Sequence, residues 1–160
     1  MRENVNKVKE QALEKMTIKM EKPRTTVVRG FTFESAHFLP DYVGKCRNFH
    51  GHSYILDIGI SGLVNETSGM VVDFGMIKRM VNPIIEELDH HLLNEVGYHH
   101  FPSDMPTAEN MVMWMKTELE LELYLFLLSA DAKISQWQDI KLESIRLYET
   151  AHNYAEWRRQ

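Results

Sequence analysis

The sequence predicts an α+β protein in which helices pack on one face of an antiparallel sheet. Strand-like segments rich in β-branched, aromatic and other apolar residues occupy residues 25–33 and 52–61. Two longer segments with helical periodicity follow at residues 74–88 and 108–125, and another strand-like segment spans residues 142–149. This order lacks the regular strand–helix alternation of a parallel sheet, which favours the α+β class.

The chain length of 160 residues is typical of one domain. Apolar residues make up 44% of the chain and charged residues 26%, close to the averages of globular proteins, so a disordered body is excluded. Residues 1–22 are rich in Lys, Glu and Met and have only a loose helical period. We interpret them as an N-terminal extension and expect a single domain at residues 23–160.

Charge and hydropathy exclude several classes of function. The net charge is −5 and the sequence has no basic stripe, which argues against nucleic-acid binding. No apolar run approaches the ~20 residues needed to cross a bilayer, so we expect no membrane partner. Residues 1–19 lack the apolar stretch of a signal peptide, and the only cysteine, Cys46, cannot form an intrachain disulfide. We therefore expect a cytoplasmic protein.

The first strand is expected at residues 25–33, followed by a turn region that contains Pro40 and Gly44. The next segment is the clearest strand, because its side chains alternate with a period of two. One face is expected to carry His52, Tyr54, Leu56, Ile58 and Ile60, and the other Ser53, Asp57 and Ser61. After a turn at residues 65–69, residues 70–72 are expected to form a short strand.

Two helices are predicted with identifiable N-caps. The Asp73 carboxylate can accept hydrogen bonds from the free amides of a helix at residues 74–88, where Pro83 predicts a kink or a division. Thr107 can cap a second helix at residues 108–125. Along one stripe of that helix, at spacings of four residues, lie Met111, Met115 and Leu119.

The remaining segments are expected to be two loops and a closing strand. The loops span residues 95–106 and 129–138, and the strand spans residues 142–149, where Ile145 and Leu147 lie among polar neighbours. No repeat of fixed period is present in the sequence, which excludes solenoid architectures.

The chain has eight histidines, and most of them are clustered. His50 and His52 point to the same face if they lie on a strand, and His37 at the end of the preceding strand can supply a third imidazole. Three imidazoles suit Zn²⁺ and leave one position open for water or substrate. Cys46 lies four residues before His50 and as a fourth ligand would close the site. Spacing alone leaves the open and the closed arrangements both possible.

Two further groups of residues are candidates for a catalytic or a binding role. The carboxylate of Asp89 can hold the imidazole of His90, or of His91 instead, in one tautomer. A polar helix end, where the helix dipole favours histidine, is the other interpretation of these residues. Glu149, beside Thr150 at the end of the last strand, can accept two parallel N–H bonds from a guanidine-like edge, or can be an ordinary exposed glutamate.

Together these motifs resemble the family of 6-pyruvoyl-tetrahydropterin and 6-carboxytetrahydropterin synthases. The resemblance covers about residues 27–157 and rests on several independent motifs in a fixed order. The matching stretches are residues 31–37, 46–54, 72–74, 88–90 with 93–94, 106–110 and 149–150. The N-terminal extension lies outside the resemblance.

The resemblance implies the tunnelling fold (T-fold), which is a four-stranded antiparallel sheet with two helices on one face. Subunits of this family form a trimeric barrel, and trimers commonly stack as hexamers. The resemblance therefore implies a homo-oligomer, a trimer or a hexamer, with active sites between subunits.

Eight residues of this chain match positions that hold metal, move protons or bind the pterin in the family. The resemblance implies that Zn²⁺ is held by His37, His50 and His52. It further implies Cys46 as the general base, Asp89 and His90 as its relay partners, and Glu149 and Thr107 as pterin-binding residues. This assignment favours the open site over the closed one.

The family substrate is the small molecule 7,8-dihydroneopterin triphosphate. Three residues separate Cys46 from His50, as in the bacterial 6-carboxytetrahydropterin synthases of the queuosine (7-deazaguanine) route, whereas the animal pyruvoyl enzymes have a longer insert. The resemblance thus implies a zinc-dependent lyase that releases triphosphate and acetaldehyde. The pyruvoyl product is the alternative within the family, and a zinc-stabilised binding protein without catalysis is the alternative from another class. Tyr148 departs from the family, which often has lysine there, and leaves fine substrate preference open.

Overall fold

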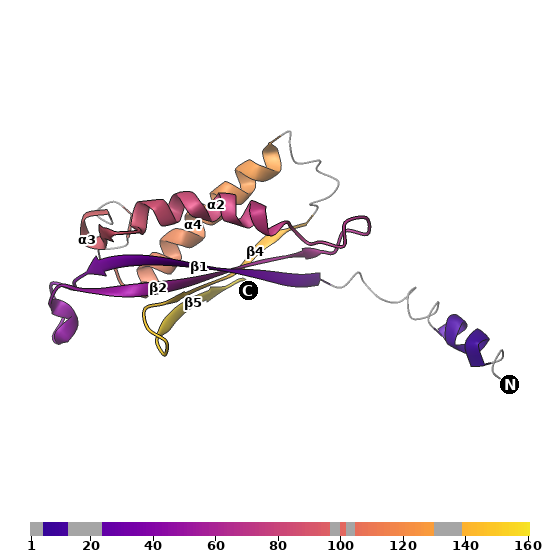
Figure 1. Ribbon diagram of the computed structural model, residues 1–160, viewed down its shortest axis with the longest axis horizontal. Helices are drawn as coiled ribbons and strands as arrows, with labels where there is room; N and C mark the ends of the chain where they lie inside the picture. The colour runs from indigo at the N-terminus through magenta and orange to yellow at the C-terminus, as the bar shows by residue number, and fades with distance from the viewer. Residues whose placement is uncertain (1–4, 13–23, 97–99, 102–104, 130–138) are drawn as a thin grey trace.

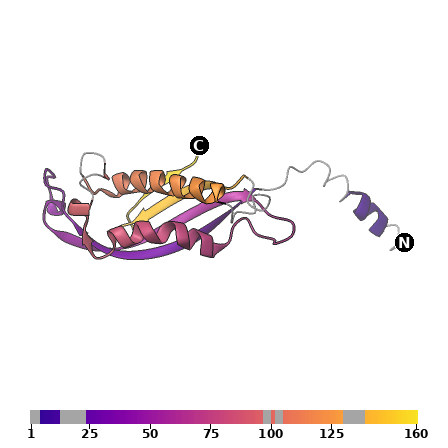
Figure 2. The ribbon, with the colours of Figure 1, turned by 90° about the horizontal axis from the view of Figure 1, so that it is seen from above.

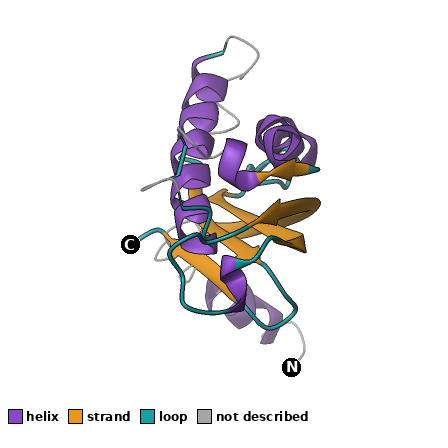
Figure 3. Ribbon diagram, turned by 90° about the vertical axis from the view of Figure 1, so that its left-hand side faces the viewer, coloured by secondary structure: helices purple, strands orange, loops and turns teal. Residues whose placement is uncertain are grey.

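The computed structural model describes residues 5–12, 24–96, 100–101, 105–129 and 139–160. A five-stranded sheet in the order β3-β1-β2-β4-β5 carries two long helices on one face (Figures 1 and 3). The strands are β1 (Arg24–His37), β2 (His50–Leu63), β3 (His91–Leu92), β4 (Lys141–Tyr148) and β5 (Tyr154–Arg158). The helices are α2 (Phe74–Leu88), α3 (Leu93–Val96) and α4 (Ala108–Leu128), with a 3-10 turn η1 (Lys45–Arg47). The α+β class is confirmed, and the expected four strands are corrected to five.

The hairpin of β1 and β2 contains the two longest strands of the sheet. Its two strands are antiparallel over 14 residues each, and the register pairs His37 with His50 and Ser35 with His52. β4 continues the sheet beside β2, and β5 forms the edge beyond it. One end of this hairpin therefore brings together residues that are 13 to 17 positions apart in the sequence.

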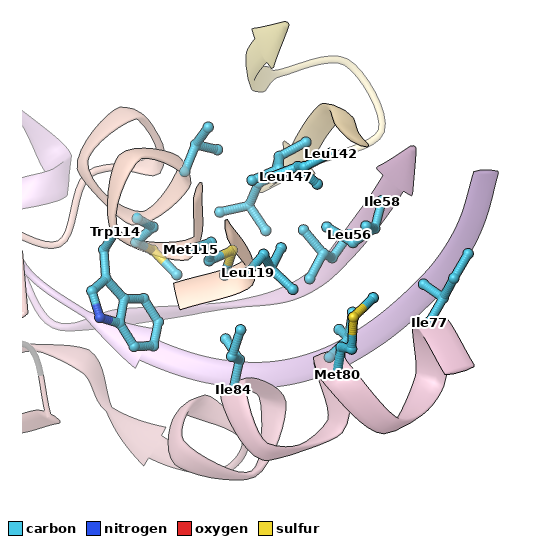
Figure 4. Close-up of a cluster of buried hydrophobic side chains, with 14 of the residues drawn as sticks. Leu56, Ile58, Ile77, Met80, Ile84, Trp114, Met115, Leu119, Leu142 and Leu147 are labelled. Atoms are coloured by element: carbon cyan, nitrogen blue, oxygen red, sulfur yellow. The ribbon is translucent and has the colours of Figure 1, made fainter. Parts of the chain in front are cut away.

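The core lies between the sheet and the two long helices, which run side by side across it (Figure 2). The predicted alternation of β2 is confirmed as far as Ile58, because Tyr54, Leu56 and Ile58 are fully buried between more exposed neighbours. Beyond Ile58 both faces are buried, including Ser61, which was expected on the polar face. The stripe predicted on α4 is buried as well, with Met111 and Met115 both inaccessible to solvent. Figure 4 shows how α2, α4 and the sheet contribute to this layer, with Ile77, Met80, Ile84, Met115, Leu119, Leu56 and Leu147 labelled.

Both predicted helix caps are confirmed. The Asp73 carboxylate accepts a hydrogen bond from the N–H of Gly75, and the Thr107 hydroxyl accepts one from the N–H of Asn110 at 3.3 Å. Pro83 does not divide α2, which is continuous from Phe74 to Leu88. The Pro83 ring is exposed, so water can solvate the carbonyl that loses its helical partner.

Other boundaries differ from the prediction. Residues 70–72 form a bend closing a turn, in which Asn65 N–H donates to the Met70 carbonyl, and not a strand; Val71 and Val72 are nevertheless buried in the core. The expected loop at residues 95–106 begins later, because α3 includes residues 95 and 96. The expected last strand corresponds to β4 and is followed by an unpredicted β5.

Some expectations fall partly or wholly outside the described residues. The loop expected at residues 129–138 is described only at Ser129, and the N-terminal extension only at residues 5–12, which are helical and exposed. The boundary expected at residue 23 remains a prediction. Among the described residues, no helix combines the length and apolar character needed to span a membrane.

Candidate metal centre and active site

Three histidines converge at the end of the β1–β2 hairpin. His37 is the last residue of β1 and pairs across the strands with His50, the first residue of β2. His52 follows two positions later on the same face of β2. One candidate ligand atom from each of the three lies within 4.8 Å of the other two, and the Nε2 atoms of His37 and His52 are 3.2 Å apart. The predicted convergence is therefore confirmed as geometry.

Hydrogen bonds of two of these rings leave a nitrogen lone pair available for a metal. Nδ1 of His37 lies 2.8 Å from the carbonyl oxygen of Pro106, and Nδ1 of His50 lies 2.8 Å from that of Asn48. A carbonyl only accepts, so both Nδ1 atoms carry the hydrogen and the Nε2 lone pairs are available. Two nitrogens bound to one tetrahedral Zn²⁺ at about 2.0–2.1 Å would be separated by about 3.3 Å. The three residues thus fit a zinc ion.

Burial favours the neutral, metal-binding form of two of these imidazoles, those of His37 and His52. His37 is only 2% exposed, and burial lowers its pKa against the opposing effect of the hydrogen bond to the Pro106 carbonyl. The pKa of His52 is also lowered, first by burial and then by the nearby His50. A metal ion and a proton compete for the same nitrogen lone pair, so a lowered pKa favours metal binding near neutral pH.

A cavity of about 510 Å³ opens in front of the three histidines. The predicted residues that line it are His37, His50, His52, Cys46, Thr107 and Glu149. Cys46 is half-buried in η1, and its carbonyl oxygen accepts a hydrogen bond from the N–H of Leu39 at 2.9 Å. Among the described residues, the group with metal-binding geometry contains the three histidines and not Cys46.

The same cavity also contains two acidic side chains, Glu149 and Glu109. Glu149 follows β4, and burial raises the pKa of its carboxyl group; the nearby Glu109 raises it further. Glu109 lies in the first turn of α4, two residues after the cap Thr107. Glu109 was not predicted as a site residue, although it lies within the matching stretch at residues 106–110. The structure therefore adds a second carboxylate to the cavity.

Asp89 and His90 form a pair elsewhere. Nδ1 of His90 lies 2.9 Å from the Asp89 carboxylate, whose other oxygen accepts the N–H of Glu34 at 2.8 Å. The pKa of Asp89 is lowered first by the hydrogen bond from Glu34 and then by His90. His90 has φ of 60°, an uncommon conformation for a residue other than glycine, and its N–H donates to the Glu34 carbonyl. The geometry thus selects His90 over His91 as the partner of Asp89.

This pair does not line the Cys46 cavity. His90 and His91 line a separate cavity of about 440 Å³, together with Phe49, His52 and Ser53. The side chain of His90 is 76% exposed. Within one chain, the structure therefore brings Cys46 to the three histidines and to Glu149, but leaves the Asp89–His90 pair facing outward.

The fold and this site define a class of α+β proteins that carry a candidate metal centre at the end of a long β-hairpin. The family model described as 6-pyruvoyl tetrahydropterin synthase matches residues 26–160. The chain belongs to this family.

Curated relatives and solved structures agree with the family. A 6-carboxy-5,6,7,8-tetrahydropterin synthase of Rickettsia conorii is 29% identical over 143 residues, covering 80% of this chain and 96% of the relative. One of Synechocystis is 37% identical over 101 residues, covering 59% of this chain and 74% of the relative. The 6-pyruvoyl tetrahydropterin synthase structure of Caenorhabditis elegans matches the fold with a TM-score of 0.70 at 24% identity, covering 88% of this chain and 99% of that one.

Proposed function

We propose that this protein is a zinc-dependent 6-carboxy-5,6,7,8-tetrahydropterin synthase acting on 7,8-dihydroneopterin triphosphate. The observation that carries the proposal is the single cavity shared by the histidine cluster, Cys46 and Glu149. It combines a candidate metal site, a thiol and a half-buried carboxylate within reach of one small molecule. Relatives with the corresponding name support the choice of substrate and product. The product would enter 7-deazaguanine (queuosine) biosynthesis.

Each residue of the cavity has a distinct role in the proposed reaction. His37, His50 and His52 would hold the zinc ion, which would supply Lewis-acid polarisation of the hydroxyl groups on the substrate side chain. Cys46 removes a proton from the carbon chain as the general base. Glu149, with Thr107, holds the pterin ring so that its side chain reaches the thiol, and such positioning can contribute several kcal/mol. The carboxylate of Glu109 is placed to take part in the same recognition.

The relay of Asp89 and His90 would come from a neighbouring subunit. The pair faces outward in one chain, and the sheet has two open edges. β3 pairs only with Ser35 and Ala36 of β1, so most of that side of β1 lacks a partner strand within the described residues, and β5 forms the other edge. Open edges favour strand pairing between chains, which supports the barrel-forming trimer or hexamer of the family.

The choice between the carboxy and the pyruvoyl product rests on two observations. The three-residue spacing between Cys46 and His50 is that of the bacterial carboxy enzymes. Relatives from Rickettsia, Synechocystis and Haemophilus influenzae carry the carboxy name, whereas the solved relatives of C. elegans and Plasmodium carry the pyruvoyl name at 24% identity or less. We therefore place the pyruvoyl product second.

The test is product analysis with the zinc-loaded protein and 7,8-dihydroneopterin triphosphate. We expect 6-carboxytetrahydropterin, acetaldehyde and triphosphate in equal amounts, detected by mass spectrometry and an aldehyde assay. A pyruvoyl pterin without acetaldehyde would establish the second candidate instead.

A relative from Pyrococcus furiosus is named a dihydroneopterin monophosphate aldolase, so the monophosphate belongs in the same assay as a competing substrate. Faster turnover of the monophosphate would contradict the proposed substrate. Unchanged substrate in both reactions, with zinc bound in full, would favour the non-catalytic zinc protein.

A further inference from the structure

Asn94 binds both backbone polar groups of Phe38. Its Oδ1 accepts the N–H of Phe38 at 2.9 Å, and its Nδ2 donates to the Phe38 carbonyl oxygen at 2.9 Å. The amide of Asn94 thus replaces the two hydrogen bonds that a neighbouring strand would supply, immediately after β1 ends at His37. Both bonds are partly buried, where water competes less for these groups.

Phe38 connects two groups of the proposed active site. The residue before it, His37, is one of the three candidate metal ligands. The residue after it, Leu39, donates its N–H to the carbonyl oxygen of Cys46 at 2.9 Å. Restraining the backbone of Phe38 therefore restrains the start of the segment that connects the candidate metal ligand His37 to Cys46.

Asn94 also lies on the segment that carries the Asp89–His90 pair. This segment is bonded to β1 at several points: the Ser35 hydroxyl donates to the Leu88 carbonyl, and His90 N–H donates to the Glu34 carbonyl. The Asn94 contact is the last of these and the one that reaches past the end of β1. It holds the residue between the candidate ligand His37 and Leu39, whose N–H is bonded to Cys46.

We propose that Asn94 is a positioning residue that sets the separation between His37 and the Cys46 thiol. The proposal rests on the proposed function for the roles of these two residues. Loss of the amide would release the backbone of Phe38 and let the segment between His37 and Cys46 open, although neither side chain is changed.

The sole cysteine provides a direct measurement, because alkylation by iodoacetamide reports only Cys46. The variant Asn94→Asp keeps the shape and the acceptor but replaces the donor by an oxygen that faces the Phe38 carbonyl. We expect Cys46 in the folded, metal-free protein to be alkylated about fivefold faster in this variant, as the loss of one net hydrogen bond allows. Asn94→Ala removes both bonds and should act at least as strongly.

Asn65 offers a matched control. Its Oδ1 also accepts backbone N–H groups, those of Thr67 and Ser68 at 2.9 and 2.8 Å, but in a turn beyond the far end of the β1–β2 hairpin. Asn65→Ala should lower the melting temperature and leave the alkylation rate at the wild-type value.

Cobalt substitution gives a second reading that needs no substrate. Co²⁺ bound to the wild-type protein reports ligand geometry through its visible absorption, and we expect Asn94→Asp to change this spectrum while Asn65→Ala does not. If Asn94→Ala does not fold, the isosteric Asp variant decides the question. Wild-type alkylation and an unchanged cobalt spectrum in folded Asn94→Asp would overturn the proposal. Because both readings omit the pterin, a failure of the proposed reaction would be seen separately, in the product assay.

Discussion

The tautomer of His37 is set by a group that no sequence pattern reveals, the carbonyl oxygen of Pro106. The His-x-His motif was sufficient to predict that His50 and His52 share one face, because strand geometry is local and periodic. The placement of His37 depends on β1 running four residues beyond the strand expected at residues 25–33. The hydrogen bond to Pro106 joins residues 69 positions apart and depends on how α4 is placed over the sheet. For the same reason Glu109 was missed, since nothing in its helical context indicates that it faces Glu149.

Glu149 provides a prediction about pH at the residue scale. Burial and Glu109 raise its pKa, so the folded protein binds this proton more tightly than the unfolded chain does. Its contribution to stability is full below the ordinary value of 4.5 and is lost as the pH rises through the raised value. We therefore expect metal-free Glu149→Gln to melt at a higher temperature than wild type at neutral pH, with no such advantage in acid.

The measurement is the melting temperature across the acid-to-neutral range, followed by calorimetry. Glu87→Gln, at an exposed position on α2, is the control for removing one negative charge. A difference between Glu149→Gln and wild type that does not change with pH would show that ionisation of Glu149 does not oppose folding.

At the scale of elements, the long segments were predicted well and the short ones poorly. The β1–β2 hairpin and α4 have many residues in register with one period, and the caps Asp73 and Thr107 mark where the helices begin. Residues 70–72 have a strand-like composition, but Val71 and Val72 are buried in a bend. Their apolar side chains are therefore removed from water without strand pairing. β5 has only five residues, and so short an alternation does not predict a strand without the pairing to β4.

At the scale of the whole molecule, the residues of the proposed active site lie on two surfaces. Cys46 and Glu149 share one cavity, while His90, the partner of Asp89, lines another and is exposed in the single chain. The sequence could not predict this separation, because it depends on how α2, β3 and the η1 turn are arranged around the end of the hairpin. The open edges of the sheet are where a second chain would pair and bring the two halves together.

Mixed oligomers test this arrangement. We expect Cys46→Ala and His90→Ala to be inactive separately, because each lacks one part of every site. When they are unfolded together and refolded as mixed oligomers, some interfaces combine an intact Cys46 from one chain with an intact His90 from another, and activity should return. Mixing the folded proteins under conditions that prevent subunit exchange is the control. Refolded mixtures that remain inactive, with mixed oligomers confirmed by native mass spectrometry, would place Cys46 and His90 of the same chain in each site.

The most direct test of the account compares zinc content and turnover in Cys46→Ala and His50→Ala. Cys46 lines the cavity without belonging to the histidine group, whereas the Nε2 lone pair of His50 is free for metal. We predict one zinc ion per chain and no turnover for Cys46→Ala, and loss of zinc for His50→Ala, measured by elemental analysis of folded protein. Loss of zinc in Cys46→Ala, or full zinc in His50→Ala, would contradict an open three-histidine centre with Cys46 as its base.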